Sequence, residues 1–422
     1  MVNSKVLKPR ILVVTYISSA FLRQSQKSLI NCYKKYSKNF EVHIINLFMS
    51  NILSECNKYN WDIIIYHSSF IGLRFNRARF LNLLKKNHQE LINIKASHKA
   101  LTIQDEFSNM DLVCDFINKY SVDTIFSVAP RQEIKKIYKN INFNKIKFFE
   151  VLTGYIDENQ ITKIKNINTF KKNWIGYRVY TRPEWGTFNL KKIKLGLLFQ
   201  KYCKQNNIKH DIAFGEENFF LGDKWNKFLL QCRAVIGIEG GSNILDWDGS
   251  FSKKINKIKN KKLLINYNYL KKLEKNLEKI KLMTISPRHL DACLTKTCQL
   301  LVKGKYNNIL KPWKHYIPIN KNMTNLSHVM KILNDDKKVN KIIHNAYKDI
   351  IQSRKYTYKK FVEFMLSKFK VNKICKEKIS FYSVFLIKIN YLNTYVCALL
   401  WSMLKKILSA KLIFRVIDIM KA

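Results

Sequence analysis

The chain has 422 residues and a formal net charge of +46. That length exceeds one ordinary hydrophobic core, so we expect two domains. The basic excess would suit a nucleic-acid-binding protein, but the lysines are scattered along the whole chain among asparagine and isoleucine, as in KKIYKNINFNKIK at 135–147. The scatter argues against a nucleic acid partner and makes a negatively charged membrane surface the better one.

The cysteine pattern and the N-terminus indicate a reducing compartment. Nine cysteines, an odd number, are spread along the chain without a CxxC pair, and the start MVNSKVLKPRILVV lacks the long apolar core of a secretory signal. Cys293 and Cys298 are the nearest pair, but no cluster of His or Cys completes a zinc set around them. We therefore expect a cytoplasmic protein without a structural metal.

Six short apolar runs, rich in β-branched residues, recur between longer segments in the first part of the chain. Continuous apolar runs separated by helix-length segments predict parallel strands that are buried on both faces of an open α/β sheet. The predicted strands cover 11–16, 41–47, 62–67, 100–106, 123–129 and 147–154.

Three polar residues stand where two of these strands end, and open α/β sheets bind ligands beyond the carboxyl ends of their strands. His67 follows one strand and is a candidate general base or hydrogen-bond donor to a substrate. Asp105 and Glu106 end the next strand, and a carboxylate there could accept a proton from an acceptor hydroxyl. A structural histidine and a solvated strand end are the alternatives.

The pattern restarts after a polar stretch that reads as a linker, at 157–173. The later segments are strand-like runs at 174–180, 210–215 and 234–243, a short apolar strand that ends the stretch 286–302, and a loop feeding a strand at 310–319. Between and after them are helical segments near 188–206 and 223–233, a Lys/Asn-rich insert at 252–280 and helices over 325–370. We therefore predict an N-terminal Rossmann-like domain over 1–160, a C-terminal Rossmann-like domain over 161–372 and a helical tail over 373–422.

The stretch SPRHLDACLTKTCQLLV, residues 286–302, has the signals of a helix start. Ser286 can cap the helix, a proline is tolerated in the first turn, and the unpaired backbone donors of a helix start attract anions. Arg288 would add a bidentate fork for a phosphate, and Asp291 would accept hydrogen bonds from sugar hydroxyls. A capped helix with a surface arginine explains the same residues equally well.

A second stretch, GIEGGSNILDWDG at 237–249, follows an apolar run, and its glycines allow a ligand to approach the backbone closely. Ordinary turn chemistry is the alternative. No P-loop is present and no GxGxxG follows the first strand, which argues against an NTPase and a dinucleotide oxidoreductase. Asp246 and Asp248 form the only DxD pair at a strand end, so support for a metal-dependent mechanism is thin.

The C-terminal tail, 379–422, is apolar with recurring cations. Polar residues interrupt every span of the roughly 20 apolar residues that a transmembrane helix needs; they include Lys388, Asn390, Lys405 and Lys406. An amphipathic helix lying in the plane of an anionic membrane fits this pattern better than a membrane span. A helix packed on the protein's own core is the alternative.

Residues 10–370 resemble the nucleotide-sugar-dependent glycosyltransferases of the GT-B fold. The resemblance is to the bacterial glycosyl transferase group 1 and CgeB-like family, which is found in surface-polysaccharide clusters. It is carried by the two stretches quoted above together with YHSSF (66–70), QDEF (104–107), FSVAP (126–130), VLTGY (151–155), IGYR (175–178) and GKYNNILKPWKHYIPI (304–319).

The resemblance implies two Rossmann-like domains facing across a cleft, with the donor held mainly by the second domain and the acceptor by the first. Asp291 looks like the residue that binds the ribose or sugar. Arg288, His289 and Lys311 would neutralise the leaving diphosphate, which a metal does in other glycosyltransferases. The implied donor-binding residues are Arg178, Glu239, Gly240, Gly241, Ser242, Arg288, His289, Asp291 and Lys311. His67 and Asp105 match first-domain active-site positions.

Two residues depart from the family pattern. Asp291 is shorter than the usual Glu, and Lys296 stands where the family has Gly, so a bulky cation close to the nucleotide could aid or obstruct binding. The leading hypothesis is a membrane-associated glycosyltransferase, without metal or cofactor, that transfers a sugar to a lipid-linked or polysaccharide acceptor. The alternatives are an inactive relative that acts as a scaffold in polysaccharide assembly and a basic nucleic-acid-binding protein.

Overall fold

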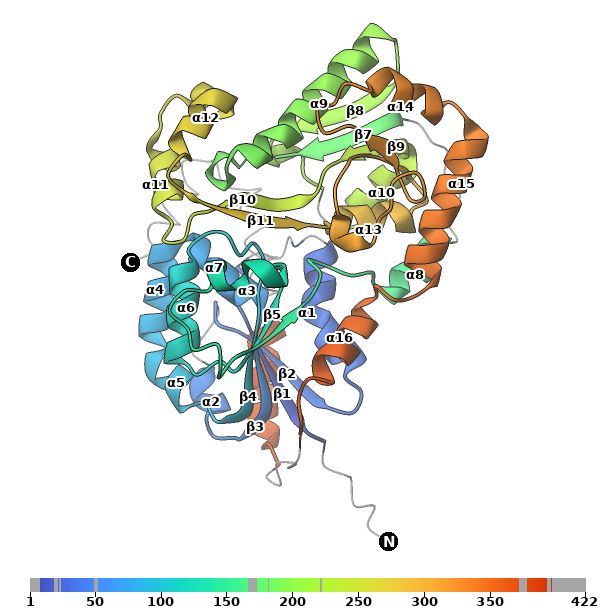
Figure 1. Ribbon diagram of the computed structural model, residues 1–422. Helices are drawn as coiled ribbons and strands as arrows, with labels where there is room; N and C mark the ends of the chain where they lie inside the picture. Colours follow the sequence, from blue (N-terminus) through green and yellow to red (C-terminus); the bar gives the residue numbers. More distant parts are fainter. Residues whose placement is uncertain are drawn as a thin grey trace.

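The computed structural model describes residues 8–18, 22, 24–48, 52–165, 173–180, 182–220, 222–371, 378–392 and 396. These residues form two α/β domains, each built on a parallel sheet (Figure 1). A cavity lies between them. The predicted fold class, two Rossmann-like domains facing across a cleft, is confirmed.

The first sheet has six parallel strands in the order β2-β1-β3-β4-β5-β6. Its strands are continuously apolar because helices cover both faces: Ile11 and Val13 belong to the core on one face, and Leu12 and Val14 to the core on the other. The strands are β1 (Arg10–Thr15), β2 (Glu41–Asn46), β3 (Trp61–Tyr66), β4 (Ala96–Thr102), β5 (Thr124–Ser127) and β6 (Lys147–Glu150). The helices are α1 (Gln24–Tyr36), α2 (Leu53–Cys56), α3 (Ser68–Ile71), α4 (Arg77–Lys86), α5 (His88–Asn93), α6 (Met110–Lys119) and α7 (Ile134–Ile137). Helix α8 (Glu158–Lys165) follows this domain, and its Ile161 and Ile164 pack in a separate cluster with Leu290 of the second domain.

The second sheet has five parallel strands in the order β13-β12-β9-β7-β8. They are β7 (Asn173–Val179), β8 (His210–Phe214), β9 (Cys232–Gly237), β12 (Cys298–Val302) and β13 (Ile317–Ile319). The helices that follow or cover them are α9 (Thr187–Gln205), α10 (Lys224–Gln231), α13 (Pro287–Leu294), α14 (Leu326–Leu333) and α15 (Asp336–Ala346). The apolar runs therefore predicted the strands of both sheets, with boundaries that differ by a few residues.

The glycine-rich stretch leaves the second sheet, although the sequence predicts one strand over 234–243. It forms β10 (Gly240–Leu245), which pairs antiparallel with β11 (Glu278–Thr284). Gly241 has φ +100°, and a Cβ atom there would lie 1.8 Å from the carbonyl oxygen of Leu282, so only glycine fits. The insert between the two strands carries α11 (Ser250–Lys257) and α12 (Tyr267–Leu273).

The ribbon of β10 and β11 docks on the first domain and joins the two domains (Figure 1). Leu245, Ile280 and Leu282 belong to the hydrophobic core of the first domain. Just beyond β10, the amide of Asp246 donates a hydrogen bond to the carbonyl oxygen of Phe107 at 2.8 Å. The domains therefore meet along a fixed contact as well as through the chain segments that connect them.

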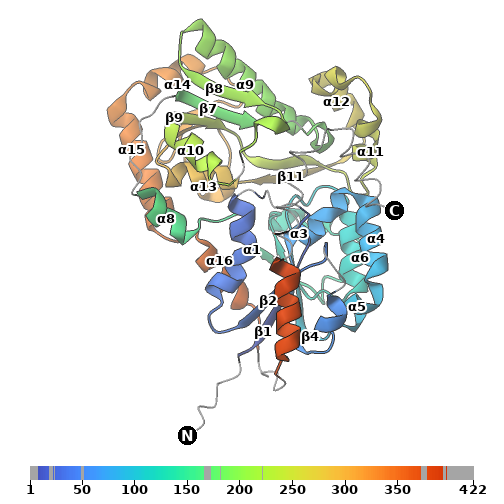
Figure 2. The same cartoon turned by 180° about the vertical axis from the view of Figure 1, so that it is seen from behind.

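Two later helices pack on the first domain. Helix α16 (Tyr358–Leu366) lies within the range that the sequence assigns to the second domain, but its Val362 belongs to the same core as Ile11 and Val13. Residues 381–392 form a helix beside β2, the edge strand of the first sheet (Figure 2). Most of the predicted tail, 397–422, lies outside the described residues. Among the described residues, no helix is both long and apolar enough to cross a membrane.

Candidate active site

A cavity of about 400 Å³ lies between the two domains. Its volume is within the range of sites that enclose small ligands. The first domain lines it with Gln104, Asp105, Thr153 and Tyr155, among others. The second domain contributes Arg178, Lys192, Trp225, Glu239, Gly240, Gly241, Arg288, His289 and Asp291. Most of the predicted donor-binding residues therefore meet at one site.

Helix α13 opens at this cavity, and its first turn is closed by its own side chains. The Ser286 hydroxyl accepts a hydrogen bond from the Arg288 amide at 3.3 Å, and the Ser286 amide donates to His289 Nδ1 at 3.1 Å. The His289 amide donates to the Ser286 carbonyl oxygen. The predicted unpaired backbone donors are therefore already used, because the capping box consumes them. Any anion bound here must be held by side chains.

Arg288 and Lys192 bring two positive side chains to the cavity. Arg288 donates to the carbonyl oxygen of Arg178 at 3.2 Å, and its guanidinium lies 5.9 Å from the ring centre of Trp225. Lys192 donates to Asn189 Oδ1 at 2.8 Å. Burial and the nearby charge of Arg288 lower the pKa of Lys192 to about 8. Two cations that line the same cavity favour binding of an anion there.

Lys192 was not among the residues predicted from the sequence. A signal was present, because Lys192, Leu195 and Phe199 have the spacing of one buried face of a helix. Leu195 and Phe199 are indeed fully buried against the second sheet. A lysine on the apolar face of an amphipathic helix is therefore the pattern that would have identified it.

Two acids line the second-domain side. Asp291 accepts a hydrogen bond from Trp225 Nε1 at 3.1 Å, and burial raises its pKa to about 7 although the tryptophan and Arg288 act in the opposite direction. Glu239 accepts from the amides of Lys305 and Tyr306 at 3.1 and 2.7 Å, and burial also raises its pKa. Both acids are therefore held in place as hydrogen-bond acceptors beside the cavity.

His289 lines the cavity but cannot neutralise a diphosphate as predicted. Burial, with the charges of Arg288 and Lys192, lowers the pKa of His289 to about 3, so the ring is neutral. Its Nδ1 accepts the Ser286 amide, which leaves the proton on Nε2. His289 thus serves as a helix cap and a neutral donor.

Arg178 lines the cavity as predicted, but contacts within the second domain already engage its guanidinium. Its guanidinium donates to the Asp211 carboxylate at 2.8 Å and to two carbonyl oxygens. The same group stacks between Phe220 and Phe228, at 4.8 and 4.4 Å from the ring centres. Arg178 therefore ties β7 to β8 and to α10 at the wall of the cavity.

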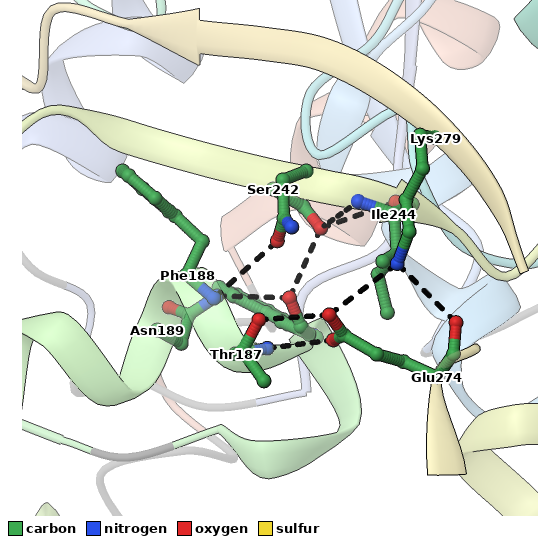
Figure 3. Close-up of polar contacts among 9 residues, drawn as sticks. Thr187, Phe188, Asn189, Ser242, Ile244, Glu274 and Lys279 are labelled. Atoms are coloured by element: carbon green, nitrogen blue, oxygen red, sulfur yellow. Dashed lines mark hydrogen bonds and ion pairs between the residues drawn. The ribbon is translucent and has the colours of Figure 1, made fainter. Parts of the chain in front are cut away.

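Two predicted donor-binding residues lie outside the cavity lining. Ser242 is fully buried, and its hydroxyl lies 3.0 Å from the carbonyl oxygen of Trp185 and 3.1 Å from that of Ile244 (Figure 3). Lys311 is exposed to solvent beyond the second sheet and does not line the cavity. Neither can bind a ligand in this site.

The insert between β10 and β11 fixes the start of α9, the helix that carries Lys192. Glu274 accepts hydrogen bonds from the amide and the hydroxyl of Thr187, both at 2.8 Å (Figure 3). Lys279 lies 3.3 Å from the same carboxylate. A carboxylate at a helix N-terminus also stabilises the helix dipole.

The first domain contributes one of its three predicted catalytic residues. Asp105 lines the cavity in a left-handed conformation with φ 53°, and Arg74 holds its carbonyl oxygen at 2.7 Å. Glu106, the next residue, points into the domain, where it accepts hydrogen bonds from the Ser127 hydroxyl and the Val128 amide. Burial raises the pKa of Glu106 to about 7. Glu106 therefore anchors this loop and does not reach the cavity.

His67 is likewise absent from the cavity lining. Its Nδ1 accepts a hydrogen bond from the Ser69 amide at 3.0 Å, which caps α3, and its Nε2 is buried without a hydrogen-bond partner. Burial lowers the pKa of His67 to about 3. The structural alternative for His67 fits these contacts, since the ring closes a helix start beneath the surface.

The DxD pair has a structural role in the described chain. Asp246 accepts hydrogen bonds from the amides of Phe251 and Ser252, both at 2.9 Å, and thereby caps α11. Within the described ranges, no group of three or more His, Cys, Asp or Glu side chains could hold a metal ion. Metal-independent chemistry stays a prediction.

Comparison with known proteins gives likeness in fold alone. No protein-family model matches the chain, and no curated protein matches its sequence. HepE from Anabaena in complex with UDP-glucose is 10% identical with a TM-score of 0.48, over 85% of this chain and 99% of HepE. An α-glucosyltransferase in complex with UDP is 12% identical with a TM-score of 0.47, over 86% of this chain and 100% of that one. TarM is 11% identical with a TM-score of 0.41 over 80% of this chain, which spans 57% of TarM.

Proposed function

We propose that the protein is a glycosyltransferase that moves a sugar from a nucleotide-sugar donor to a lipid-linked or polysaccharide acceptor in surface glycan biosynthesis. The observation that carries the proposal is the pairing of Lys192 and Arg288 at a cavity between two Rossmann-like domains. Two cations are what a departing nucleoside diphosphate needs when no metal neutralises it.

In this proposal the donor lies along the second domain. Its diphosphate contacts Lys192 and Arg288, and its ribose or sugar hydroxyls donate hydrogen bonds to Asp291. The ring of Trp225 beside Arg288 offers a flat apolar surface to the base. Glu239, whose carboxylate is already oriented by two backbone amides, is a second acceptor for sugar hydroxyls.

The acceptor enters from the first domain, where Asp105 is the candidate base for its hydroxyl. Asp105 is the one predicted catalytic carboxylate that lines the cavity, and Arg74 fixes the backbone that carries it. A carboxylate at this position could take the proton as the hydroxyl attacks the sugar. We propose that transfer needs neither metal nor cofactor and occurs in the cytoplasm, on the inner face of the cell membrane.

An inactive relative that acts as a scaffold is the second candidate, and it depended on obstruction by Lys296. The structure weakens that argument, because Lys296 is exposed and its ammonium lies 4.8 Å from the ring centre of Tyr347, outside the cavity lining. Lys296 therefore neither blocks the donor site nor assists it.

The test is release of free nucleotide from UDP-, GDP-, CMP- and dTDP-sugars, each with and without a polyprenol-linked or polysaccharide acceptor. We expect release from one donor class, faster with acceptor, unaffected by a chelator, and at least about tenfold slower in Asp105→Asn with donor affinity unchanged. Binding of a donor without release from any of them would support the scaffold instead. Absence of donor binding would end the proposal.

A further inference from the structure

The helix at 381–392 is held on the first domain by one of its faces. The Ser383 hydroxyl donates to the Glu55 carboxylate at 2.5 Å. The Asn390 amide group pairs with the backbone of Asn46 on β2, accepting from its amide at 2.7 Å and donating to its carbonyl oxygen at 3.2 Å. Ile387, between them, is 1% exposed in the core of the domain. These contacts fix the rotation of the helix about its axis.

The opposite face of this helix presents apolar side chains to solvent. Phe381 is 88% exposed, Phe385 50% and Leu392 59%. Together with exposed Lys388 they follow the spacing i, i+4, i+7 and i+11, which places them in one stripe along a helix. We call Phe381, Phe385, Lys388 and Leu392 the outer stripe.

The outer stripe has the composition of a surface that contacts lipid. Apolar side chains with a cation among them can enter the headgroup region while the ammonium reaches the phosphates. Exposed Tyr382 adjoins the stripe, and tyrosine favours the membrane interface. Clustered exposed apolar groups of this kind mark interaction sites.

Charge decides between a membrane and a second copy of the chain. The chain carries a formal net charge of +46, so two copies repel one another, whereas a surface of anionic lipids attracts the chain. We propose that the outer stripe docks the first domain on a membrane surface that contains anionic lipids. Because the helix is fixed on the acceptor-side domain, docking holds that domain at the lipid surface.

This inference does not depend on donor chemistry. The experiment is flotation of the full chain with vesicles of phosphatidylcholine alone and with vesicles that contain phosphatidylglycerol in roughly a 3:1 mixture. We expect the wild type to float with the anionic vesicles, to stay behind with the neutral ones, and to lose binding as salt is raised. Equal binding to both kinds of vesicle, or none to either, would overturn the proposal.

Substitutions separate the outer stripe from the general charge of the chain. Leu392→Ser and Leu197→Ser form a matched pair, since Leu197 on α9 is 51% exposed at a site remote from the stripe. We expect the Phe381→Ser/Phe385→Ser double variant to weaken vesicle binding at least about tenfold, Leu392→Ser to weaken it several-fold, and Leu197→Ser to leave it unchanged. Lys388→Glu should also weaken binding to the anionic vesicles.

The stripe variants also distinguish docking on lipid from dimer formation. If the stripe variants float like the wild type, the stripe is not the docking surface. If the wild type forms dimers that the double variant lacks, and vesicle binding does not change, the stripe joins two copies and the lipid proposal fails. Nucleotide binding measured on the same variants should be unchanged, so failure of this proposal is distinguishable from failure of the donor site.

Discussion

Lys192 of the second domain and Asp105 of the first bring opposite charges to one cavity. The charge of Asp105 favours the protonated lysine, whereas burial and Arg288 disfavour it more strongly, and the pKa of Lys192 settles at about 8. A bound diphosphate would add negative charge beside Lys192 and raise its pKa. Binding of the proposed donor is therefore coupled to the protonation of this lysine.

The affinity for a nucleoside diphosphate should fall as the pH rises above about 8. Lys192 is charged below its pKa and attracts the diphosphate, and it becomes neutral above it. Titration calorimetry between pH 7 and pH 9.5 should show constant affinity at first and then a decline. Lys192→Gln should bind the nucleoside diphosphate at least about tenfold more weakly at pH 7, and its affinity should not decline between pH 7 and pH 9.5. Lys194→Gln, on the exposed face of α9, is the matched control; equal binding by both variants would contradict the assignment.

Asp291→Asn should stabilise the ligand-free protein at alkaline pH. Burial raises the pKa of Asp291 to about 7, so the folded state favours the protonated carboxyl. The stability that the protonated Asp291 carboxyl contributes to the folded state is fully present below the pKa of this group in the unfolded chain, and it is lost as the pH rises through about 7. In chemical unfolding, the variant should gain on the order of 1 kcal/mol over the wild type at pH 8 and little at pH 4. A pH-independent difference would show that the carboxyl is not buried in this way.

Asp246→Ala should destabilise the protein by about 2–4 kcal/mol, because it leaves one buried and one partly buried amide of α11 without acceptors where the ribbon meets the first domain. Asp248→Ala is the control. Asp248 is exposed and accepts from the Ser250 amide at 3.0 Å, so its loss should cost less than about 1 kcal/mol. Thermal and chemical unfolding of the full chain measure both, and equal effects would argue against the role of Asp246.

Lys296→Gly should leave nucleotide binding unchanged and raise stability. Lys296 has φ 52°, a conformation in which a side chain costs roughly 1 kcal/mol and glycine does not. Two costs reduce this gain: the contact between Lys296 and Tyr347 is lost, and glycine has greater conformational freedom in the unfolded chain. A net gain of up to about 1 kcal/mol is expected in thermal unfolding. Altered nucleotide affinity would mean that Lys296 influences the site after all.

The sequence predicted the strands of both sheets because buried parallel strands are continuous apolar runs that need no distant information. It predicted less about where individual polar side chains point. Asp105 and Glu106 are neighbours, yet one lines the cavity and the other enters the core, and no local pattern distinguishes them. Side chains alternate between the two faces along a strand, but Asp105 and Glu106 lie in the loop after β4, where the backbone conformation of the loop decides which side chain faces the cavity.

Contacts between distant segments account for the other differences. Arg178 was predicted to bind the donor, but Asp211 and two aromatic rings, all remote in sequence, occupy its guanidinium. The ribbon of β10 and β11 docks on the first domain through Asp246, a residue that reads as part of a metal motif when the sequence is considered alone. The contacts of Arg178 and Asp246 depend on tertiary packing, which a local sequence motif does not report.

In the proposed function, Arg288 and its neighbours bind the phosphates of a nucleotide-sugar. The most direct measurement is thermal unfolding of the full chain with UDP, GDP, CMP and dTDP, and with the matching nucleosides, for the wild type, Arg288→Gln and Arg131→Gln. Arg131 is exposed and does not line the cavity. We expect one nucleotide to raise the unfolding temperature of the wild type and of Arg131→Gln, its nucleoside to leave that temperature unchanged, and Arg288→Gln to lose the shift. No shift with any nucleotide, or an equal shift in Arg288→Gln, would contradict this proposal.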